Sequence, residues 1–362
     1  MAKREYTVGV IGLGFGRSHI PAFQAHGCRV VAVCQRNRAQ AQAIAQKYGV
    51  PDVHERWEDL LEKSRPEIVV IATPPHLHRP IALAAFGQGA HVLCEKPVAL
   101  NAQDARDILA AAARAKRTAM TNFNWRSPAA FQRFHEMVQE GFLGQLLHVQ
   151  VRYLFGRFAD PAVTSTWRMD KSQAGQGTMG DAGVHAIDFV QWNFGPIVRV
   201  AAQSSILPSR MMADGSTPAD AEDICQFIGQ LASGAQVSFA VSRVARGANE
   251  QTMEAYGTNG ALRYGLPRDI PRWWRGQLHA TTGPNGAFEA VPTRAVVPRT
   301  AGEGELPDVV GKTTIAPLVK RFLAGIRRKE SPSPSLEEGV RAQLVLDAIL
   351  TSVQTRAWQD VG

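Results

Sequence analysis

The sequence predicts an α/β protein in which a doubly wound parallel sheet is followed by a second α/β domain with a large, open, mainly antiparallel sheet. In the first third of the chain, short continuous apolar runs alternate with helical periods, a pattern typical of strands covered on both faces. Later runs are longer and alternate between apolar and polar residues, which favours a sheet with one exposed or partner-covered face. A length of 362 residues is large for one hydrophobic core, so we place two domains at residues 1–122 and 123–362.

Strands and helices alternate regularly up to residue 121. Apolar residues between Ile81 and Phe86 fall on one helical stripe, and Gly89 stands where a C-terminal cap belongs. Asn101 is expected to cap the next helix, whose buried stripe includes Ala105 and Ile108. The expected parallel strands are residues 8–11, 30–34, 68–72, 91–94 and 119–121. This alternation indicates a doubly wound fold.

A glycine-rich turn, Gly12-Leu13-Gly14-Phe15-Gly16, follows the first strand. At this place in a doubly wound fold, glycines allow a tight turn and bring backbone N–H groups close to a pyrophosphate. The turn therefore predicts a dinucleotide site that includes Gly12, Gly14, Phe15 and Gly16. Its spacing is one residue shorter than the usual G-x-G-x-x-G pattern, which leaves the individual phosphate contacts open.

The end of the second strand bears on the choice of nucleotide. A site that prefers NAD usually places Asp or Glu there, to bind the ribose hydroxyls. This chain has Gln35, Arg36 and Arg38 instead. Because guanidinium groups pair with phosphate in bidentate fashion, the sequence favours NADP over NAD. The alternative is that the two arginines are solvated loop residues.

The second domain begins with a helix at Ser127-Pro128 and ends with a helix after the Ser/Pro run 331–335. Ser233-Gly234 and Asn259-Gly260 are turns of the hairpin type. We expect residues 266–305, rich in Gly, Pro and Arg, to form a long loop. The expected strands are residues 146–155, 198–205, 224–231, 235–244 and 251–257.

Asp181 and His185 lie one helical turn apart where a loop enters a helix, and Asp188 shares their face. A carboxylate beside a histidine orients the ring and raises its basicity, which suits a general base near neutral pH. The alternative is a structural Asp–His hydrogen bond at a helix start.

Lys96 follows the fourth parallel strand, so it emerges at the carboxyl edge of the sheet, where ligands of doubly wound folds bind. An ammonium group there can stabilise negative charge that develops on a substrate oxygen. Pro97 restricts the local backbone and allows a cis peptide bond. Thr73 and Pro74 end the third strand at the same edge and are expected to line the cofactor, with His78 starting the helix that follows.

Together these residues resemble the glucose–fructose oxidoreductase, inositol dehydrogenase and rhizopine-catabolism family (Gfo/Idh/MocA). The resemblance covers essentially the whole chain and rests on the glycine turn, Thr73-Pro74 with His78, Glu95-Lys96-Pro97, Trp167-Arg168 and Asp181-x-Gly183-x-His185. It implies a Rossmann domain, followed by an α/β domain whose open sheet often forms a dimer or tetramer interface.

The same resemblance implies that Lys96, Asp181 and His185 are catalytic and that Glu95 and Pro97 position the lysine near the nicotinamide. The substrate would then meet Lys96, Asn124, Trp167, Arg168, Asp181 and His185. The chain departs from the family where three consecutive glycines are frequent, because it has Gly175-Gln176-Gly177. We expect Gln176 to alter the pocket.

The predicted function is an NAD(P)-dependent dehydrogenase or reductase that acts on a secondary alcohol or carbonyl of a sugar, polyol or cyclitol. Two alternatives stay open: a glycosidase that uses a tightly held NAD transiently, and a non-catalytic nucleotide-binding regulator. The expected assembly is a homodimer or a homotetramer.

Composition argues against other classes of protein. The formal net charge is +8, but no basic run carries interleaved aromatic residues, so we expect no nucleic-acid partner. No apolar stretch is long enough for a membrane span, and the N-terminus continues into the first strand without room for a signal peptide. The cysteines have no metal-ligand spacing, which predicts reduced core thiols, no metal and a cytoplasmic protein; they are Cys28, Cys34, Cys94 and Cys225.

Overall fold

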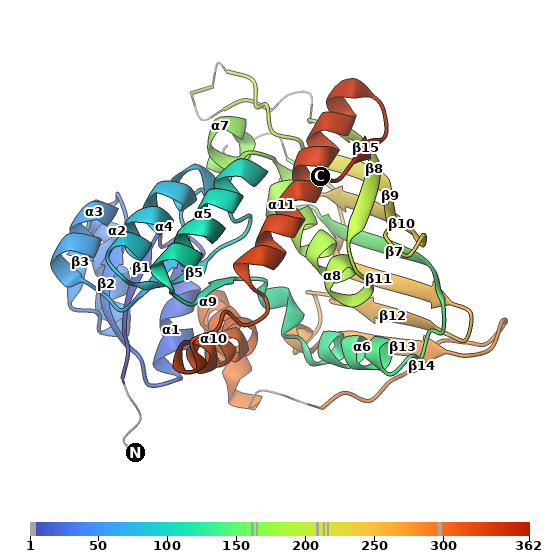
Figure 1. The fold of residues 1–362 in the computed structure, drawn as a ribbon, viewed down its shortest axis with the longest axis horizontal. Coiled ribbons are helices and arrows are strands. Elements are labelled where there is room, and N and C mark those ends of the chain that lie inside the picture. The colour runs from blue at the N-terminus through green and yellow to red at the C-terminus, as the bar shows by residue number, and fades with distance from the viewer. Residues whose placement is uncertain are drawn as a thin grey trace. The chain divides into compact units, whose positions relative to one another are not determined.

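The computed structural model describes residues 5–160, 163, 166–207, 210–212, 214–215, 217–294 and 299–362. The chain packs as two compact units that are not contiguous in sequence. The first consists of Met1–Ser127 with Val297–Val340, and the second of Pro128–Val296 with Arg341–Gly362. Figure 1 labels helices and strands of both units where there is room.

The first unit is built on a six-stranded sheet with the order β3-β2-β1-β4-β5-β6, and every neighbouring pair is parallel. The strands are β1 (Thr7–Ile11), β2 (Arg29–Cys34), β3 (Asp52–His54), β4 (Ile68–Ile71), β5 (His91–Cys94) and β6 (Ala119–Thr121). This order confirms the predicted Rossmann domain. The sequence pattern missed β3, because this edge strand has only three residues and none of them is buried.

The helices of the first unit begin where the sequence supplies caps. The Asn37 side chain accepts a hydrogen bond from Gln40 N at 3.0 Å, and Asn101 accepts one from Asp104 N at 2.9 Å, as predicted for Asn101. The helices are α1 (His19–Gln24), α2 (Arg38–Tyr48), α3 (Trp57–Asp59), α4 (His78–Gly87), α5 (Ala102–Ala115), α9 (Leu306–Val310) and α10 (Ala316–Arg328).

A late segment of the chain covers the outer edge of β6. Thr121 N donates to the carbonyl oxygen of Pro334 at 3.0 Å, and Ala119 N donates to Ser331 Oγ at 3.1 Å. Met120 and Ser335 form an antiparallel bridge. Such cover removes an exposed sheet edge. The packing units therefore differ from the division proposed at residues 122/123, because 297–340 pack with the first unit.

The second unit is built on a nine-stranded mixed sheet with the order β14-β13-β12-β11-β7-β10-β9-β8-β15 (Figure 1). β7 and β10 run parallel, and the other neighbouring pairs are antiparallel. The strands are β7 (Leu146–Phe155), β8 (Ile197–Ser205), β9 (Ile224–Leu231), β10 (Gln236–Ser242), β11 (Asn249–Gly257), β12 (Ala261–Gly265), β13 (Gln277–Thr281), β14 (Glu289–Ala290) and β15 (Gln359–Asp360).

The prediction of one long loop over residues 266–305 is wrong where β13 and β14 form. β13 extends the sheet by pairing with β12, and its Leu278 is buried on the inner face. The strand has only five residues, and Leu278 alone among them is buried, so the sequence shows no clear apolar pattern there. Residues 295–298 of that predicted loop lie outside the described residues.

The core of the second unit is aromatic. The ring centroid of Phe131 lies 4.0 Å from that of Phe189 and 4.9 Å from that of Tyr264. These ring contacts join two helices to β12. The helices are α6 (Ala129–Gln139), α7 (Lys171–Ala174), α8 (Val184–Phe194) and α11 (Leu336–Thr355), the last of which starts in the first unit. Within the described ranges, no helix combines the length and apolar character needed to cross a bilayer.

Candidate active site

The glycine turn after β1 needs two of its glycines for packing and leaves the third accessible. Gly12 has a φ of +89°, and a Cβ on it would lie 2.4 Å from Ala72 O. A Cβ on Gly16 would lie 2.8 Å from the Ala72 side chain. A Cβ on Gly14 would meet no atom within 4 Å. The turn therefore closes tightly in spite of its shorter spacing, and its open side is at Gly14, next to the half-buried Phe15.

Gln35 joins the end of β2 to this turn. Its Oε1 accepts a hydrogen bond from Leu13 N at 2.9 Å, and its Nε2 donates to Gln40 Oε1. The guanidinium groups of Arg36 and Arg38 are exposed, and Arg38 pairs with Glu55 at 3.1 Å. An exposed pair of this kind contributes only about 0–1 kcal/mol, so Arg38 is available to another anion.

Thr73 and Pro74 follow β4 beside the glycine turn, since a Cβ on Gly12 would lie 2.8 Å from Thr73 N. The Thr73 hydroxyl is buried and finds no hydrogen-bond partner among the described residues. A buried polar atom without a partner is costly unless a ligand or water satisfies it. Together with the accessible Gly14, it shows that the residues present fit a dinucleotide.

His78 is fully buried and lies between two loops at the edge of the sheet. Its Nε2 lies 2.9 Å from Thr73 O, and its Nδ1 lies 3.0 Å from Pro97 O. Burial lowers the pKa of His78, although these carbonyl oxygens oppose the effect. The histidine thus holds the Thr73 loop to the loop after β5, and its contact with the cofactor stays a prediction.

Lys96 follows β5 directly after a buried carboxylate. Glu95 accepts hydrogen bonds from Asn122 Nδ2 at 2.6 Å and from Lys96 N at 3.3 Å, and its Oε1 lies 2.8 Å from His19 Nε2. Burial acts to raise the pKa of Glu95, but the His19 hydrogen bond and the charges of His19 and Lys96 outweigh it and lower this pKa. The Lys96–Pro97 peptide bond is cis. The half-buried Lys96 therefore directly follows a buried, ionised carboxylate, to which its own backbone N–H donates.

Asp181 and His185 lie in the second unit, at the start of α8. Met179–Gly183 forms a wide, π-type helical turn that carries Asp181 and leads into the helix with His185. Both His185 and Asp188 are buried, whereas Asp181 is half-buried. Single π-type turns inside α-helices are frequent at functional sites.

Glu222 fixes the entry to that turn. Its carboxylate accepts hydrogen bonds from Gly177 N at 2.8 Å and from Met179 N at 2.9 Å. Gly177 is required there, because a Cβ would lie 2.1 Å from Glu222 O. The glycine four residues before Asp181 is thus needed because the chain packs closely against Glu222 there.

Arg168 lies beside Asp181. Its Nε lies 3.5 Å from Asp181 Oδ1, and its guanidinium group stacks 4.4 Å above the ring of Trp167. The fully buried Arg243 donates to Arg168 O at 2.9 Å and to Asp223 Oδ1 at 2.6 Å. This buried pair anchors the Trp167–Met169 turn and with it the Arg168 side chain.

Two residues predicted to shape the substrate pocket make internal contacts. Asn124 is buried in the first unit, and its Nδ2 donates to Thr314 Oγ1 at 2.9 Å. Gln176 is buried in the second unit, and its Nε2 donates to Leu346 O in α11 at 2.6 Å. The amide that replaces the middle glycine is thus used in packing against α11, and a direct role of either residue toward a substrate stays a prediction.

Sequence reasoning missed the residues that support the site: His19, Asn122, Glu222, Asp223 and Arg243. His19 has a local signal, since it stands three residues after the last glycine of the turn. Glu222, Asp223 and Arg243 have none, because their partners lie 20 or more residues away in the chain.

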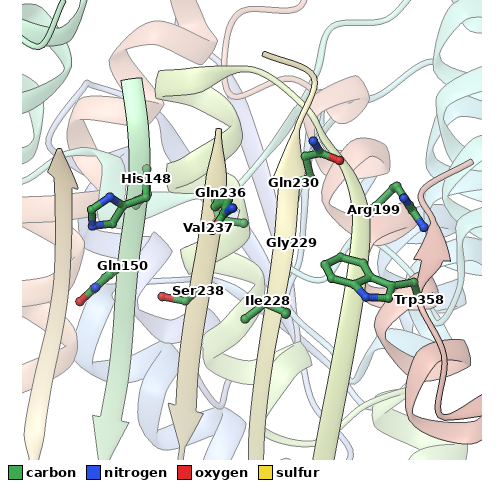
Figure 2. A pocket seen from close by; sticks show the side chains of 11 residues that line it. His148, Gln150, Arg199, Ile228, Gly229, Gln230, Gln236, Val237, Ser238 and Trp358 are labelled. Carbon is green, nitrogen blue, oxygen red and sulfur yellow. The ribbon is translucent and has the colours of Figure 1, made fainter. Parts of the chain in front are cut away.

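A shallow pocket of about 450 Å³ lies elsewhere, on the outer face of the nine-stranded sheet. Figure 2 shows His148, Gln150, Ser238 and Ile228 on its strands, with Trp358 near the chain terminus. Among the described residues, no group of three or more His, Cys, Asp or Glu side chains could hold a metal ion.

A six-stranded parallel sheet with a glycine turn after its first strand defines a dinucleotide-binding protein of the Rossmann class. The chain belongs to the Gfo/Idh/MocA oxidoreductase family. The model of its NAD-binding Rossmann domain matches residues 6–123, and the model of its C-terminal domain matches residues 131–263. The protein is thus an oxidoreductase with a nicotinamide-binding fold.

Named relatives of the chain include sugar dehydrogenases. Levoglucosan dehydrogenase of Pseudarthrobacter phenanthrenivorans is 29% identical and covers 99% of this chain and 98% of its own length. An uncharacterized oxidoreductase of Synechocystis sp. is 31% identical over 97% of this chain and 95% of its own length. The solved complex of levoglucosan dehydrogenase with NADH and levoglucosan has a TM-score of 0.87 at 29% identity, covering 99% of this chain and all of its own.

Proposed function

We propose that this protein is an NAD(P)-dependent dehydrogenase or reductase that acts on a secondary alcohol of a sugar, polyol or cyclitol. The observation that carries the proposal is the position of Lys96 in the first unit. It directly follows β5 and the buried carboxylate of Glu95, and the same unit contains the glycine turn with its open side at Gly14. Support comes from relatives named as dehydrogenases of levoglucosan and D-apiose.

The residues divide the chemistry as follows. When bound, the nicotinamide would supply the acceptor for the hydrogen that leaves the substrate carbon as hydride. His185 takes the hydroxyl proton, directly or through Lys96, and the Lys96 ammonium stabilises the oxygen as negative charge develops. Asp181 supports His185 and is itself held next to Arg168. In reduction, the same groups return the proton to the carbonyl oxygen.

The first test is the absorbance of reduced nicotinamide during incubation with sugars, polyols and cyclitols. We expect substrate-dependent turnover that Lys96→Ala and His185→Ala each lower by at least 100-fold, a loss typical of removed acid–base or electrostatic groups. Nucleotide affinity, measured by fluorescence titration, should change little. Lys63→Ala is the matched control, because Lys63 is an exposed lysine of the same unit, paired with Asp59.

Other outcomes of this test point to other functions. Loss of nucleotide binding in both variants would mean that these residues are structural. Nucleotide retained through purification without net reduction would favour a glycosidase with transient redox, and binding without any turnover would favour a regulator.

We further propose that the preferred nucleotide is NADP. Support comes from the exposed guanidinium groups of Arg36 and Arg38 after β2, and from the sequence of residues 34–38, which has no Asp or Glu at the position where NAD sites usually carry one. The double change Arg36→Ala/Arg38→Ala should raise KM for NADP at least tenfold and leave KM for NAD within about twofold, if each bidentate contact contributes about 1.5–3 kcal/mol. Equal effects on both nucleotides would contradict the assignment.

We also propose that the protein forms a homodimer or homotetramer through the outer face of its nine-stranded sheet. Across the neighbouring strands β7, β10, β9 and β8 the register aligns Gln150, Ser238, Ile228 and Ala201 in one row, which has no charge and includes an Ile that is 51% exposed. Interface cores are depleted in charged residues in the same way. The charged pair Arg152–Glu250 lies to one side of this row.

We place the protein in the cytoplasm. All four cysteines are buried and free of disulfides, as expected in a reducing compartment. Burial, with Glu58 and Asp59 nearby, raises the pKa of the Cys34 thiol to about 12, which keeps it protonated and unreactive.

A further inference from the structure

His19 connects the glycine turn to the loop of Lys96. It is the first residue of α1, directly after the short turn Gly16–Ser18 that ends the glycine segment. Its ring is fully buried, and Nε2 lies 2.8 Å from Glu95 Oε1, 76 residues further along the chain. The Phe15 ring meets the His19 ring edge-on at 6.3 Å. One side chain thus contacts both a residue of the predicted phosphate-binding turn and the carboxylate next to Lys96.

The ring makes its polar contact with Glu95 alone, as far as the described residues show. Nδ1 is buried and has no hydrogen-bond partner there. Burying an imidazole with one unsatisfied nitrogen costs free energy, and an apolar side chain of similar size would avoid this cost. A histidine at this position is therefore explained by what Nε2 does for Glu95 and not by packing.

Glu95 in turn has few donors. His19, Asn122 Nδ2 and the backbone N–H of Lys96 are the hydrogen-bond partners that the structure gives it. The titratable groups that act on it are His19 from α1, Lys96 and Cys94 beside it in the chain, and His78 from α4. Removing the His19 donor would leave a buried carboxylate partly unpaired, which either becomes protonated or turns toward other partners.

We propose that His19 is a positioning residue for Lys96. His19 acts through the Glu95 carboxylate and couples the geometry of the glycine turn to that of the lysine. The inference rests on the proposed function, in which Lys96 stabilises the substrate oxygen. It assigns His19 no contact with substrate. Its physical content is that Lys96 keeps its reactive position only while Glu95 is ionised and held by His19.

The test compares two replacements of His19 in the full-length protein. Leucine fills similar volume but cannot donate, so His19→Leu should lower kcat about tenfold to hundredfold, the cost of a small misplacement of a reacting group. KM for the nucleotide should change less than threefold. Glutamine places an amide N–H near the Nε2 position, so His19→Gln should recover most of kcat. His26→Gln is the matched control, because His26 Nε2 lies 2.8 Å from the carbonyl oxygen of Ala316, the first residue of α10.

A pH profile separates positioning from simple loss of structure. Without its His19 donor, Glu95 binds a proton more readily, so the acidic limb of the kcat profile should move upward by about one pH unit in His19→Leu and return in His19→Gln. A structural defect would lower the melting temperature without moving this limb. In the Glu95→Gln background, His19→Leu should cost less than twofold, because the two changes remove the same interaction.

Three results would overturn the inference. The first is a His19→Leu enzyme with kcat within twofold of wild type. The second is a His19→Leu enzyme in which the acidic limb of the kcat profile does not move. The third is a loss of kcat from His19→Leu that is as large in the Glu95→Gln background as in wild type. If His19→Leu does not fold, His19→Asn replaces it, since the shorter amide does not reach Glu95. Lys96→Ala is assayed in parallel: if it retains turnover, the proposed function has failed, whereas loss there with a normal His19→Leu enzyme rejects this inference alone.

Discussion

At the scale of single residues, Glu95 depends most clearly on its neighbours. It is buried at 6% exposure, where a carboxylate is unfavourable, yet His19, Asn122 and the Lys96 backbone donate to it. These donors and the Lys96 charge lower its pKa in spite of burial. A group of this kind stabilises the fold only where it is ionised.

This dependence predicts how acid affects stability. Because the folded-state pKa of Glu95 lies below its unfolded value of about 4.3, its ionised form stabilises the fold above that pH. The contribution is lost as pH falls through the folded-state pKa. Urea unfolding of wild type and Glu95→Gln should therefore show a difference in free energy of unfolding that is constant near neutral pH and shrinks below about pH 4.3. A difference that stays constant into the acid range would contradict this account.

A site residue can be predicted from the sequence only where the pattern that marks it lies in the residues next to it in the chain. Lys96, Asp181 and Gly12 stand at strand or helix ends that apolar runs mark, so their positions follow from pattern and spacing. The Gly177–Glu222 contact and the anchoring of Arg168 by Arg243 join distant segments, and no spacing encodes them. The contact of Asn124 with Thr314 is a further example, because it joins residues 190 positions apart, and the predicted role of Asn124 toward a substrate stays a prediction.

At the scale of elements, the glycines of the turn after β1 have two different roles: Gly16 allows close packing, and Gly14 leaves one side of the turn accessible. Gly16 allows the turn to lie against Ala72, whereas the space above Gly14 is open. Strands buried on both faces were predictable because they are continuous apolar runs, and β13 and β14 were not because they are short and polar.

This division predicts opposite results for two substitutions two residues apart. Gly16→Ala places a methyl group 2.8 Å from Ala72 Cβ and should cost about 1–3 kcal/mol of stability. Gly14→Ala should leave the free energy of unfolding within about 0.5 kcal/mol of wild type. It should weaken nucleotide binding, because the methyl group occupies the open side of the turn. Urea unfolding and fluorescence titration measure the two effects, and unchanged affinity in Gly14→Ala would place the phosphates elsewhere.

At the scale of the whole molecule, the proposed assembly depends on the outer face of the large sheet. Ile228 stands in the middle of its uncharged row, and Trp358 is 46% exposed nearby, in the pocket that Figure 2 shows. Exposed apolar groups that lie close together on a sheet face favour association with a partner.

A single charge should test this interface. Ile228→Asp places a carboxylate in the row and should convert the assembly into monomers, because burying a charge in an apolar contact is strongly unfavourable. Light scattering after gel filtration measures the mass. Gln277→Asp on β13 is the control, since Gln277 is exposed and β13 is not one of the four strands that carry the row. An Ile228→Asp protein with wild-type mass would exclude this face as the interface.

The cover over β6 has a consequence for how the protein is made. Thr121 Oγ1 donates to the carbonyl oxygen of Ser335, 214 residues later in the chain. At about 5–20 residues per second, a ribosome delivers that partner roughly 10–40 s after β6 has emerged. During this interval the edge of the first sheet is open to other strands and to chaperones, while all the strands of the second sheet except β15 are translated. The unit that is synthesised first is therefore among the last to be completed, and nascent chains stopped before residue 331 would expose it.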